Sequence, residues 1–165
     1  MRKGSRAASP AKHEADRLAR ARAMLDDLKR AGLKMTPQRV AIVECFAGDR
    51  AHPTAQDLFD RLKRQFPQMS FATVYNTLDA LANVGLCGTL RMGNAARFDP
   101  NTDPHHHAVC DRCAKIYDIP AGTLAPNSAT VRTLQRSASS PGFSVRAVEL
   151  IYRGLCSACQ AAPFA

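Results

Sequence analysis

Two cysteine pairs of identical spacing constrain this chain more than any other feature. The pairs are Cys110-x-x-Cys113 and Cys156-x-x-Cys159, and forty-two residues separate them. Together they supply four thiolates, the tetrahedral ligand set of a structural zinc site. A redox dithiol is the alternative, but one pair would suffice for it and neither pair lies between a predicted strand and a predicted helix. The cysteines therefore predict a segment that folds around one Zn²⁺ ion.

The rest of the composition is typical of a globular chain. Its 165 residues can form one compact domain or two small ones. The sequence contains no apolar run of eighteen residues and no apolar segment after its basic N-terminus, so we expect neither a membrane span nor a secretory signal. We therefore expect a cytoplasmic protein, in which cysteines bind metal rather than form disulfides. Cys45 and Cys87 lie outside the pairs and are interpreted as buried core residues.

The positive charge is concentrated at the N-terminus. Residues 1–40 hold eleven Lys/Arg and four Asp/Glu, a net charge of +7, whereas residues 41–104 have a net charge of −1 and residues 105–165 one of +3. A basic arm of this kind indicates a polyanionic partner, of which nucleic acid is the first candidate. For residues 1–12 alone, a solvated disordered tail is the alternative.

The N-terminal half has the pattern of a winged helix-turn-helix. Hydrophobic periodicity and capping residues predict four helices, which begin near Leu18, Thr36, Thr54 and Ser70. The third start resembles a capping box, because Asp57 follows Thr54 at the required spacing. Two short strands over 86–90 and 95–98 follow, around a Gly-Asn turn.

The predicted helix over 71–84 is the second helix of the pair, the one that enters the major groove. Asn76 can pair with adenine, and Tyr75 can contact a thymine methyl or a phosphate, although Tyr75 at the edge of the core is the alternative. The residues for which we expect DNA contacts are Arg39, Ala72, Thr73, Tyr75 and Asn76.

A second region begins after Pro104. Its pattern predicts strands over 105–109 and 115–119, a helix over 124–139 and a strand over 143–152. A unit of about sixty residues usually needs a metal or a partner chain for stability. Zinc supplies the first, and we expect dimerisation to supply the second.

Three consecutive histidines open this second region. Side chains alternate along a strand, so His105 and His107 share one face and His106 points to the other. His105 and His107 can therefore bind one ion together. Further candidate ligands are His52, Asp99 and Asp118, although a structural role for His52 is an open alternative. Such a mixed nitrogen and oxygen set suits Fe²⁺, Mn²⁺ or Zn²⁺.

Six motifs in order resemble the ferric uptake regulator superfamily and, within it, the branch of peroxide regulators. The resemblance covers roughly residues 14–160. It rests on Met35-Thr-Pro-Gln-Arg39, His52-Pro-Thr-Ala-Gln-Asp57, Ser70-Phe-Ala-Thr-Val-Tyr-Asn76, Arg97-Phe-Asp99, His105-His-His-Ala-Val-Cys-Asp-Arg-Cys113 and Cys156-Ser-Ala-Cys159.

The resemblance implies an α+β fold with three parts: a basic N-terminal extension over 1–13, a winged helix-turn-helix DNA-binding domain over 14–100, and a small α/β dimerisation and metal-binding domain over 101–165 that holds the four-cysteine zinc site. It also implies one regulatory site for Fe²⁺ or Mn²⁺. Asp118 matches the peroxide branch, since the iron regulators more often carry Glu there. The implied ligands are His52, Asp99, His105, His107 and Asp118.

One metal site found in many members of the superfamily is expected to be missing. That site uses His and Glu residues that reach into the C-terminal helix. Here His107 is the last histidine, and Glu149 is the only acidic residue after Asp118.

The implied function is that of a homodimeric, metal-dependent transcriptional repressor. Its implied partner is double-stranded DNA with an A/T-rich palindromic operator. Peroxide would relieve repression through Fe²⁺-catalysed oxidation of His52 or His105. Sensing of iron, zinc or manganese without peroxide chemistry is the alternative.

A zinc hydrolase or deaminase is disfavoured, because the sequence has neither H-x-E nor H-E-x-x-H. We therefore expect no enzyme, no small-molecule substrate and no membrane partner. A zinc-ribbon module without DNA binding is opposed by the basic arm and the helix-turn-helix pattern.

Overall fold

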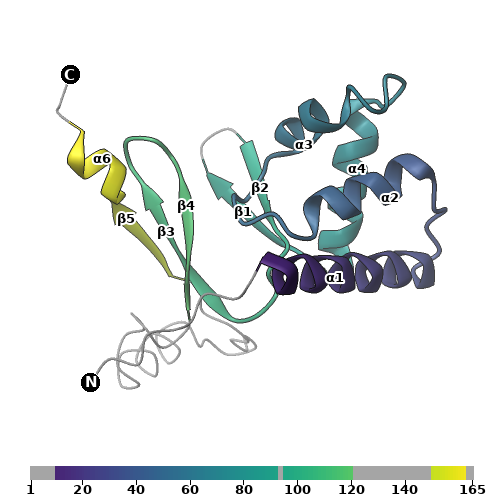
Figure 1. The fold of residues 1–165 in the computed structure, drawn as a ribbon, viewed down its shortest axis with the longest axis horizontal. Coiled ribbons are helices and arrows are strands. Elements are labelled where there is room, and N and C mark those ends of the chain that lie inside the picture. Colours follow the sequence, from purple (N-terminus) through teal and green to yellow (C-terminus); the bar gives the residue numbers. More distant parts are fainter. Residues whose placement is uncertain (1–9, 93–94, 121–149, 163–165) are drawn as a thin grey trace, which may run out of the picture. The chain divides into compact units, whose positions relative to one another are not determined.

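The computed structural model describes residues 10–92, 95–120 and 150–162. The chain divides between Thr102 and Asp103 into two compact units. The N-terminal unit holds four helices and a two-stranded sheet, and the described part of the C-terminal unit holds a three-stranded sheet and a short helix (Figure 1).

The N-terminal unit is a winged helix-turn-helix, as the pattern predicts. Helices α1, α2, α3 and α4 are followed by the β1–β2 hairpin, and the antiparallel register pairs Gly88 with Asp99. The bounds of these elements are Pro10–Arg30 (α1), Pro37–Phe46 (α2), Ala55–Leu62 (α3), Phe71–Asn83 (α4), Gly88–Met92 (β1) and Ala95–Asp99 (β2). Both strands extend slightly beyond the C-terminal ends of the predicted ranges, and the Gly93-Asn94 turn lies outside the described residues.

Three of the helices begin at the capping residues expected from the sequence. Thr36 and Ser70 each accept a hydrogen bond from the backbone N–H three residues further on, in α2 and α4. Thr54 and Asp57 form the predicted capping box, in which each side chain accepts a hydrogen bond from the other residue's backbone N–H.

Asp57 is also held in its charged form. Burial raises its pKa, but hydrogen bonds from Thr54 and the nearby charges of Arg97 and Arg61 outweigh burial, and the pKa lies below its ordinary value.

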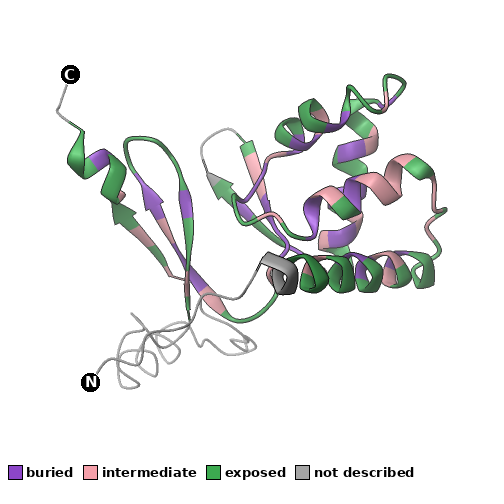
Figure 2. Cartoon of the chain, in the orientation of Figure 1, coloured by how far each residue is buried: buried purple, intermediate pink, exposed green. Residues whose placement is uncertain are grey.

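The core of the N-terminal unit lies where the four helices meet. Phe46, Leu58, Leu78 and Leu81 are completely buried, and Cys87 is buried beside them. Figure 2 shows the buried positions on the inward faces of α2 and α4. Cys45 is half-buried and packs against this core. The prediction of a buried core cysteine is therefore confirmed for Cys87, whereas Cys45 lies at the edge of the core.

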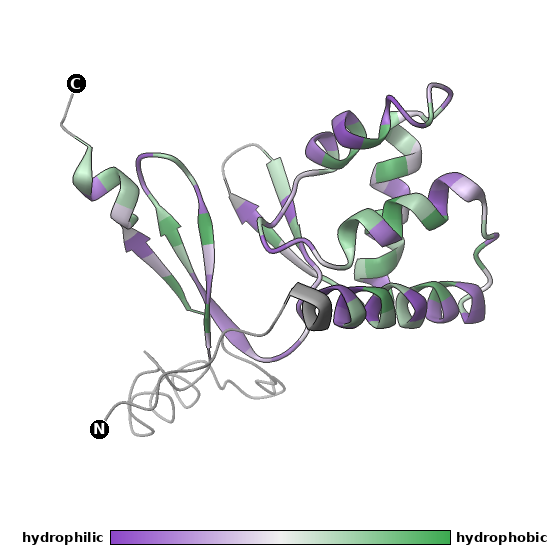
Figure 3. Ribbon diagram, viewed as in Figure 1, coloured by the Kyte–Doolittle hydropathy of each residue, from purple (hydrophilic) through white to green (hydrophobic). Residues whose placement is uncertain are grey.

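Of the four residues whose spacing predicts helix α1, Ala21 and Leu28 are buried, Leu25 is half-buried and Leu18 is exposed. Ala21, Met24 and Leu28 are buried, whereas Leu18 is 40% exposed. Figure 3 shows hydrophilic and hydrophobic residues alternating along this helix. α1 also begins at Pro10, which is earlier than expected. Within the described ranges, no helix is both long enough and apolar enough to span a lipid bilayer.

The C-terminal unit is built on strand β3, which lies at the centre of its sheet. The order is β4-β3-β5, with β4 antiparallel and β5 parallel to β3. The bounds are His105–Cys110 (β3), Ile116–Pro120 (β4), Ile151–Gly154 (β5) and Ser157–Ala161 (α6). The predicted helix over 124–139 and most of the predicted strand over 143–152 lie outside the described residues, as does Glu149.

Candidate metal centres and DNA-binding surface

Four cysteines from two distant parts of the sequence meet at one end of the C-terminal sheet. Cys110 ends β3, Cys113 lies in the turn to β4, Cys156 caps α6 and Cys159 lies within that helix. One ligand atom from each residue lies within 4.8 Å of the other three. The structure therefore brings together the cysteines that the spacing predicts as a group.

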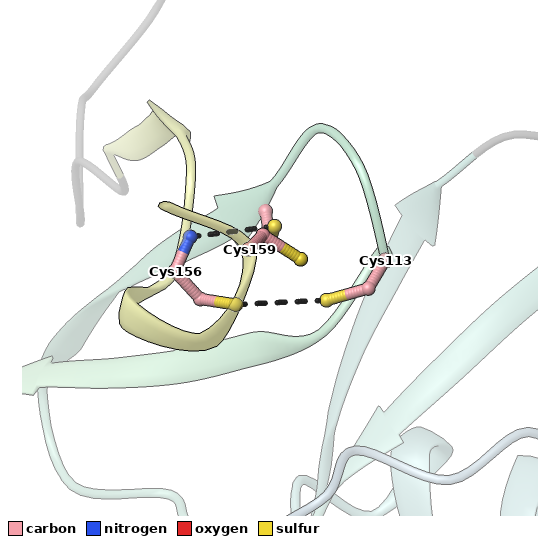
Figure 4. A group of neighbouring side chains, drawn as sticks. Cys113, Cys156 and Cys159 are labelled. Carbon is pink, nitrogen blue, oxygen red and sulfur yellow. Dashed lines mark hydrogen bonds between the residues drawn. The ribbon is translucent and has the colours of Figure 1, made fainter. Parts of the chain in front are cut away.

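The sulfur positions fit a tetrahedral metal ion. Cys113 Sγ and Cys156 Sγ are 3.7 Å apart (Figure 4), and Cys110 Sγ accepts the backbone N–H of Cys156 at 3.4 Å. Four sulfur atoms at about 2.3 Å from zinc would form a tetrahedron with edges of about 3.8 Å. The separation of Cys113 Sγ and Cys156 Sγ thus matches one edge of that tetrahedron.

Hydrogen bonds within this cluster lower the pKa of two of its thiols and raise the pKa of a third. Backbone N–H groups, that of Cys156 foremost, lower the pKa of Cys110 to about 6. The backbone N–H of Cys159 lowers the pKa of Cys156, and the hydrogen bond between the two side chains raises the pKa of Cys159 to about 12. Neighbouring thiolates repel one another, so a bound cation would favour the deprotonated forms of these cysteines.

The turn that carries the first pair is tightly fixed. Ala114 N donates to Cys110 O at 2.9 Å, and Ala114 has a left-handed backbone with φ of 57°. The Arg112 guanidinium donates to Cys159 O at 2.7 Å and to Ala162 O at 3.1 Å, which ties the turn to α6. A left-handed backbone costs a residue with a Cβ atom roughly 1–2 kcal/mol.

His105, His107 and Asp118 form a second group in the C-terminal unit. Their ligand atoms lie within 4.8 Å of one another, and Asp118 stands directly opposite His107 in the β3–β4 register. The two Nε2 atoms are 2.9 Å apart, and His105 Nε2 is 3.9 Å from Asp118 Oδ1. His107 is buried, His105 is half-buried and Asp118 is exposed.

The orientation of His105 is set by its other ring nitrogen. Nδ1 lies 2.6 Å from the carbonyl oxygen of Asp103, and a carbonyl can only accept a hydrogen bond. In the neutral ring, Nδ1 therefore carries the proton, and the lone pair of Nε2 faces His107. This is the arrangement in which metal-binding histidines are usually found.

His106 points away from this group, as the alternation along a strand predicts. Its ring packs edge-on to Tyr152, with ring centres 6.4 Å apart. It is buried, and within the described ranges its Nδ1 atom has no hydrogen-bond partner.

His52 and Asp99 form a buried pair in the N-terminal unit. His52 is 1% exposed, Asp99 is 3% exposed, and His52 Nε2 lies 3.6 Å from Asp99 Oδ2. Asp99 Oδ1 accepts the backbone N–H of Asn101 at 2.8 Å, which leaves Oδ2 to face the histidine. His52 has a left-handed backbone with φ of 52°, a conformation that costs a non-glycine residue about 1–3 kcal/mol and is concentrated at functional sites.

The five predicted regulatory ligands thus fall into two groups, one in each unit. Each group contains at least one histidine with a carboxylate beside it. Binding of one ion by all five residues stays a prediction.

The exposed face of α4 carries the residues predicted to contact DNA. Ala72, Tyr75 and Asn76 are exposed, and Thr73 is half-buried next to the cap. Tyr75 is 44% exposed while its ring packs edge-on to Phe98, so the residue is both at the core edge and accessible. These side chains are positioned for contact with a groove, and the contacts themselves stay predictions.

Arg39 is differently placed from the other residues of the predicted DNA-binding set. It is half-buried, and its guanidinium donates to the carbonyl oxygen of Lys34. A DNA contact from Arg39 would have to use the part of the guanidinium that this hydrogen bond leaves accessible.

Comparison with known proteins identifies the family. A winged helix-turn-helix unit followed by a unit with clustered cysteine and histidine ligands is the architecture of a metal-binding regulator, and the sequence model of the ferric uptake regulator family matches residues 30–151. The chain belongs to the ferric uptake regulator family.

Two curated relatives and one solved structure refine this result. A peroxide operon regulator of Bacillus subtilis (strain 168) is 41% identical over 136 residues, which are 82% of this chain and 90% of the relative. The peroxide-responsive repressor PerR of Staphylococcus aureus (strain Mu50) is 34% identical over 134 residues, which are 81% and 86% of the two chains. The ferric uptake regulator Fur of Helicobacter pylori has a TM-score of 0.67 at 17% identity, covering 88% of this chain and 95% of that chain, and supports the fold.

Several residues that support the candidate sites have no recognisable pattern in the sequence. Asp103 and Asn101 act through backbone groups, which no side-chain pattern reveals. Arg112 contacts the carbonyl oxygen of Cys159 in α6, and its place between Cys110 and Cys113 is the sequence feature that points to this contact.

Proposed function

We propose that this protein is a metal-dependent transcriptional repressor that binds double-stranded DNA as a homodimer in the cytoplasm and responds to peroxide. The observation that carries the proposal is the convergence of two histidine nitrogens and one carboxylate on a single face of the C-terminal sheet. The two curated relatives support the peroxide branch, because both are named as peroxide regulators.

The four cysteines are proposed to hold a structural Zn²⁺ ion. The 3.7 Å separation of two sulfur atoms and the soft thiolate donors both support zinc. The ion would join the β3–β4 turn to α6 and would contribute to folding of the C-terminal unit.

The regulatory site is proposed to hold Fe²⁺ or Mn²⁺. Its ligands would come from both units, and the mixed donors suit these metals. The proposed ligands are His52, Asp99, His105, His107 and Asp118.

The ligand set links metal occupancy to the DNA-binding unit. His52 lies two residues before Thr54, which caps α3, and α3 precedes the proposed recognition helix α4. A ligand that binds one arrangement of the two units more tightly shifts the population toward it. We propose that the metal-bound arrangement is the one that binds an A/T-rich palindromic operator through Tyr75 and Asn76.

Bound Fe²⁺ would supply the redox chemistry by which hydrogen peroxide is reduced: one oxygen atom of the peroxide would be added to a histidine, and the other would leave as water. His52 and His105 are the residues of this chain proposed to be oxidised. Oxidation of either would weaken the ligand set and relieve repression, a response that Mn²⁺ would not support readily.

The test is mass spectrometry of zinc-containing protein loaded with Fe²⁺ or with Mn²⁺ and exposed to hydrogen peroxide. We expect one added oxygen atom on a peptide that contains His52 or His105, in the iron-loaded sample alone. Oxygen on cysteines only, or equal oxidation with both metals, would contradict peroxide sensing. A regulator of iron, zinc or manganese uptake without peroxide chemistry would then be the better description.

A further inference from the structure

Arg97 connects the wing strand to the segment that carries His52. Its Nη1 atom donates to the carbonyl oxygen of His52 at 3.1 Å, across forty-five residues of sequence. The contact is partly buried, and Arg97 lies two residues before Asp99 on β2. The side chain of Arg97 thus contacts the proposed ligand His52, and Arg97 itself lies on the strand that ends in the proposed ligand Asp99.

Two backbone contacts run parallel to this side-chain contact. Phe98 N donates to Pro53 O at 2.9 Å, and Thr54 forms an isolated bridge with Arg97. Residues 52–54 are therefore attached to β2 immediately before α3 begins (Figure 1). The backbone contacts hold residues 53 and 54, and the side chain of Arg97 holds the carbonyl of His52.

The backbone of His52 has a conformation that needs external support. With φ of 52°, it occupies the left-handed region, which a residue with a Cβ atom rarely adopts without compensating contacts. The orientation of the peptide group after His52 sets the backbone angle ψ of this residue, and with it the direction of the Cα–Cβ bond relative to the segment that follows. A donor that holds the His52 carbonyl therefore restrains the backbone from which the imidazole extends to 3.6 Å from Asp99.

We infer that Arg97 is a positioning residue that holds His52 and Asp99 as a preformed half of the regulatory metal site. The inference rests on the proposed function of these two residues as ligands. Groups that orient a ligand without touching the metal typically account for a 10–100-fold effect on metal affinity.

The experiment measures Mn²⁺ affinity in the full-length, zinc-loaded protein without DNA. Free Mn²⁺ is followed by electron paramagnetic resonance during titration of the wild type, Arg97→Met, Arg97→Lys and Arg91→Met. Arg91 is the matched control, because it is an exposed arginine on the neighbouring strand β1 of the same hairpin. Zinc content and the thermal unfolding midpoint are recorded for every variant.

We expect Arg97→Met to weaken Mn²⁺ binding about 10–100-fold while zinc stays bound. Arg97→Lys keeps the charge and one donor, so its affinity should lie between those of Arg97→Met and the wild type. Arg91→Met should bind as the wild type does.

Wild-type affinity in Arg97→Met would overturn the inference, and so would an equal loss in Arg91→Met, which would indicate an effect of net charge. If Arg97→Met does not fold, the shorter and neutral Arg97→Gln replaces it under the same criteria.

His52→Ala separates this inference from the proposed function. Unchanged Mn²⁺ affinity in His52→Ala would refute the ligand assignment itself. Weak binding in His52→Ala together with normal binding in Arg97→Met would refute the role of Arg97 alone.

Discussion

His105 Nε2 and His107 Nε2 lie 2.9 Å apart on one face of strand β3. Two imidazole nitrogens bound to one ion at about 2.1 Å and at a right angle would be about 3.0 Å apart. The C-terminal unit therefore presents half of a metal site with close to the required spacing, before any ligand from the N-terminal unit is added.

His107→Ala should lose most of its affinity for Mn²⁺, because it removes one of these two nitrogens. His106→Phe is the matched control: it changes the neighbouring histidine on the opposite face and keeps a ring against Tyr152. Isothermal titration with Mn²⁺ in zinc-loaded protein distinguishes the two. A stronger effect of the His106 substitution would mean that the regulatory ion binds on the other face of the sheet.

Cys113→Ser should lose the structural zinc and unfold the C-terminal unit or break the dimer. The reason is that metal binding by four thiolates contributes directly to folding free energy. Cys45→Ala, at a half-buried cysteine outside the cluster, should retain one zinc ion per subunit. Metal analysis and sedimentation velocity provide the readouts, and a stable, zinc-free dimer of Cys113→Ser would exclude a structural zinc at this cluster.

Ala114→Gly should stabilise the C-terminal unit by about 1 kcal/mol, because glycine adopts the left-handed backbone of this position without strain. Ala108→Gly is the control, since Ala108 lies in the middle of β3, where glycine weakens a strand. The thermal unfolding midpoint of the zinc-loaded protein should rise for the first variant and fall for the second. A lower midpoint for Ala114→Gly would disprove the strain argument.

Asn76→Ala should relax the base preference of the operator complex and cost about 1–3 kcal/mol of binding free energy. Asn83→Ala removes an exposed asparagine from the end of the same helix and should leave the preference unchanged. Gel-shift titrations against operator variants, at one fixed salt concentration, compare the two. If Asn83→Ala alters the preference and Asn76→Ala does not, another part of α4 reads the bases.

The predictable parts of the fold are those that local chemistry determines. Thr36, Thr54 and Ser70 mark the starts of α2, α3 and α4 because each side chain satisfies a backbone N–H of its own helix. The cysteine cluster was equally predictable, since two short-spaced pairs leave few other ways to satisfy four thiolates.

The less predictable parts depend on tertiary contacts. The leucine spacing of α1 selected Leu18, whereas packing buries Met24, because the orientation of a helix depends on what it packs against. The left-handed backbone of His52 and its contact with Arg97 join residues far apart in sequence, and no periodic pattern encodes either of them. The same is true of the carbonyl of Asp103 that orients His105.

The parallel pairing of β3 with β5 also sets the order in which this unit can mature during synthesis. A parallel neighbour cannot be supplied by a tight turn, so β3 must wait for residues 151–154 before its second edge is covered. The same wait applies to the first cysteine pair, because Cys156 and Cys159 follow β5 directly. A ribosome-bound chain that stops before Ile151 would therefore present an open sheet edge and two unpartnered zinc ligands at once. The pairing of β5 with β3 and the completion of the four-cysteine set would therefore depend on the same late segment of the chain.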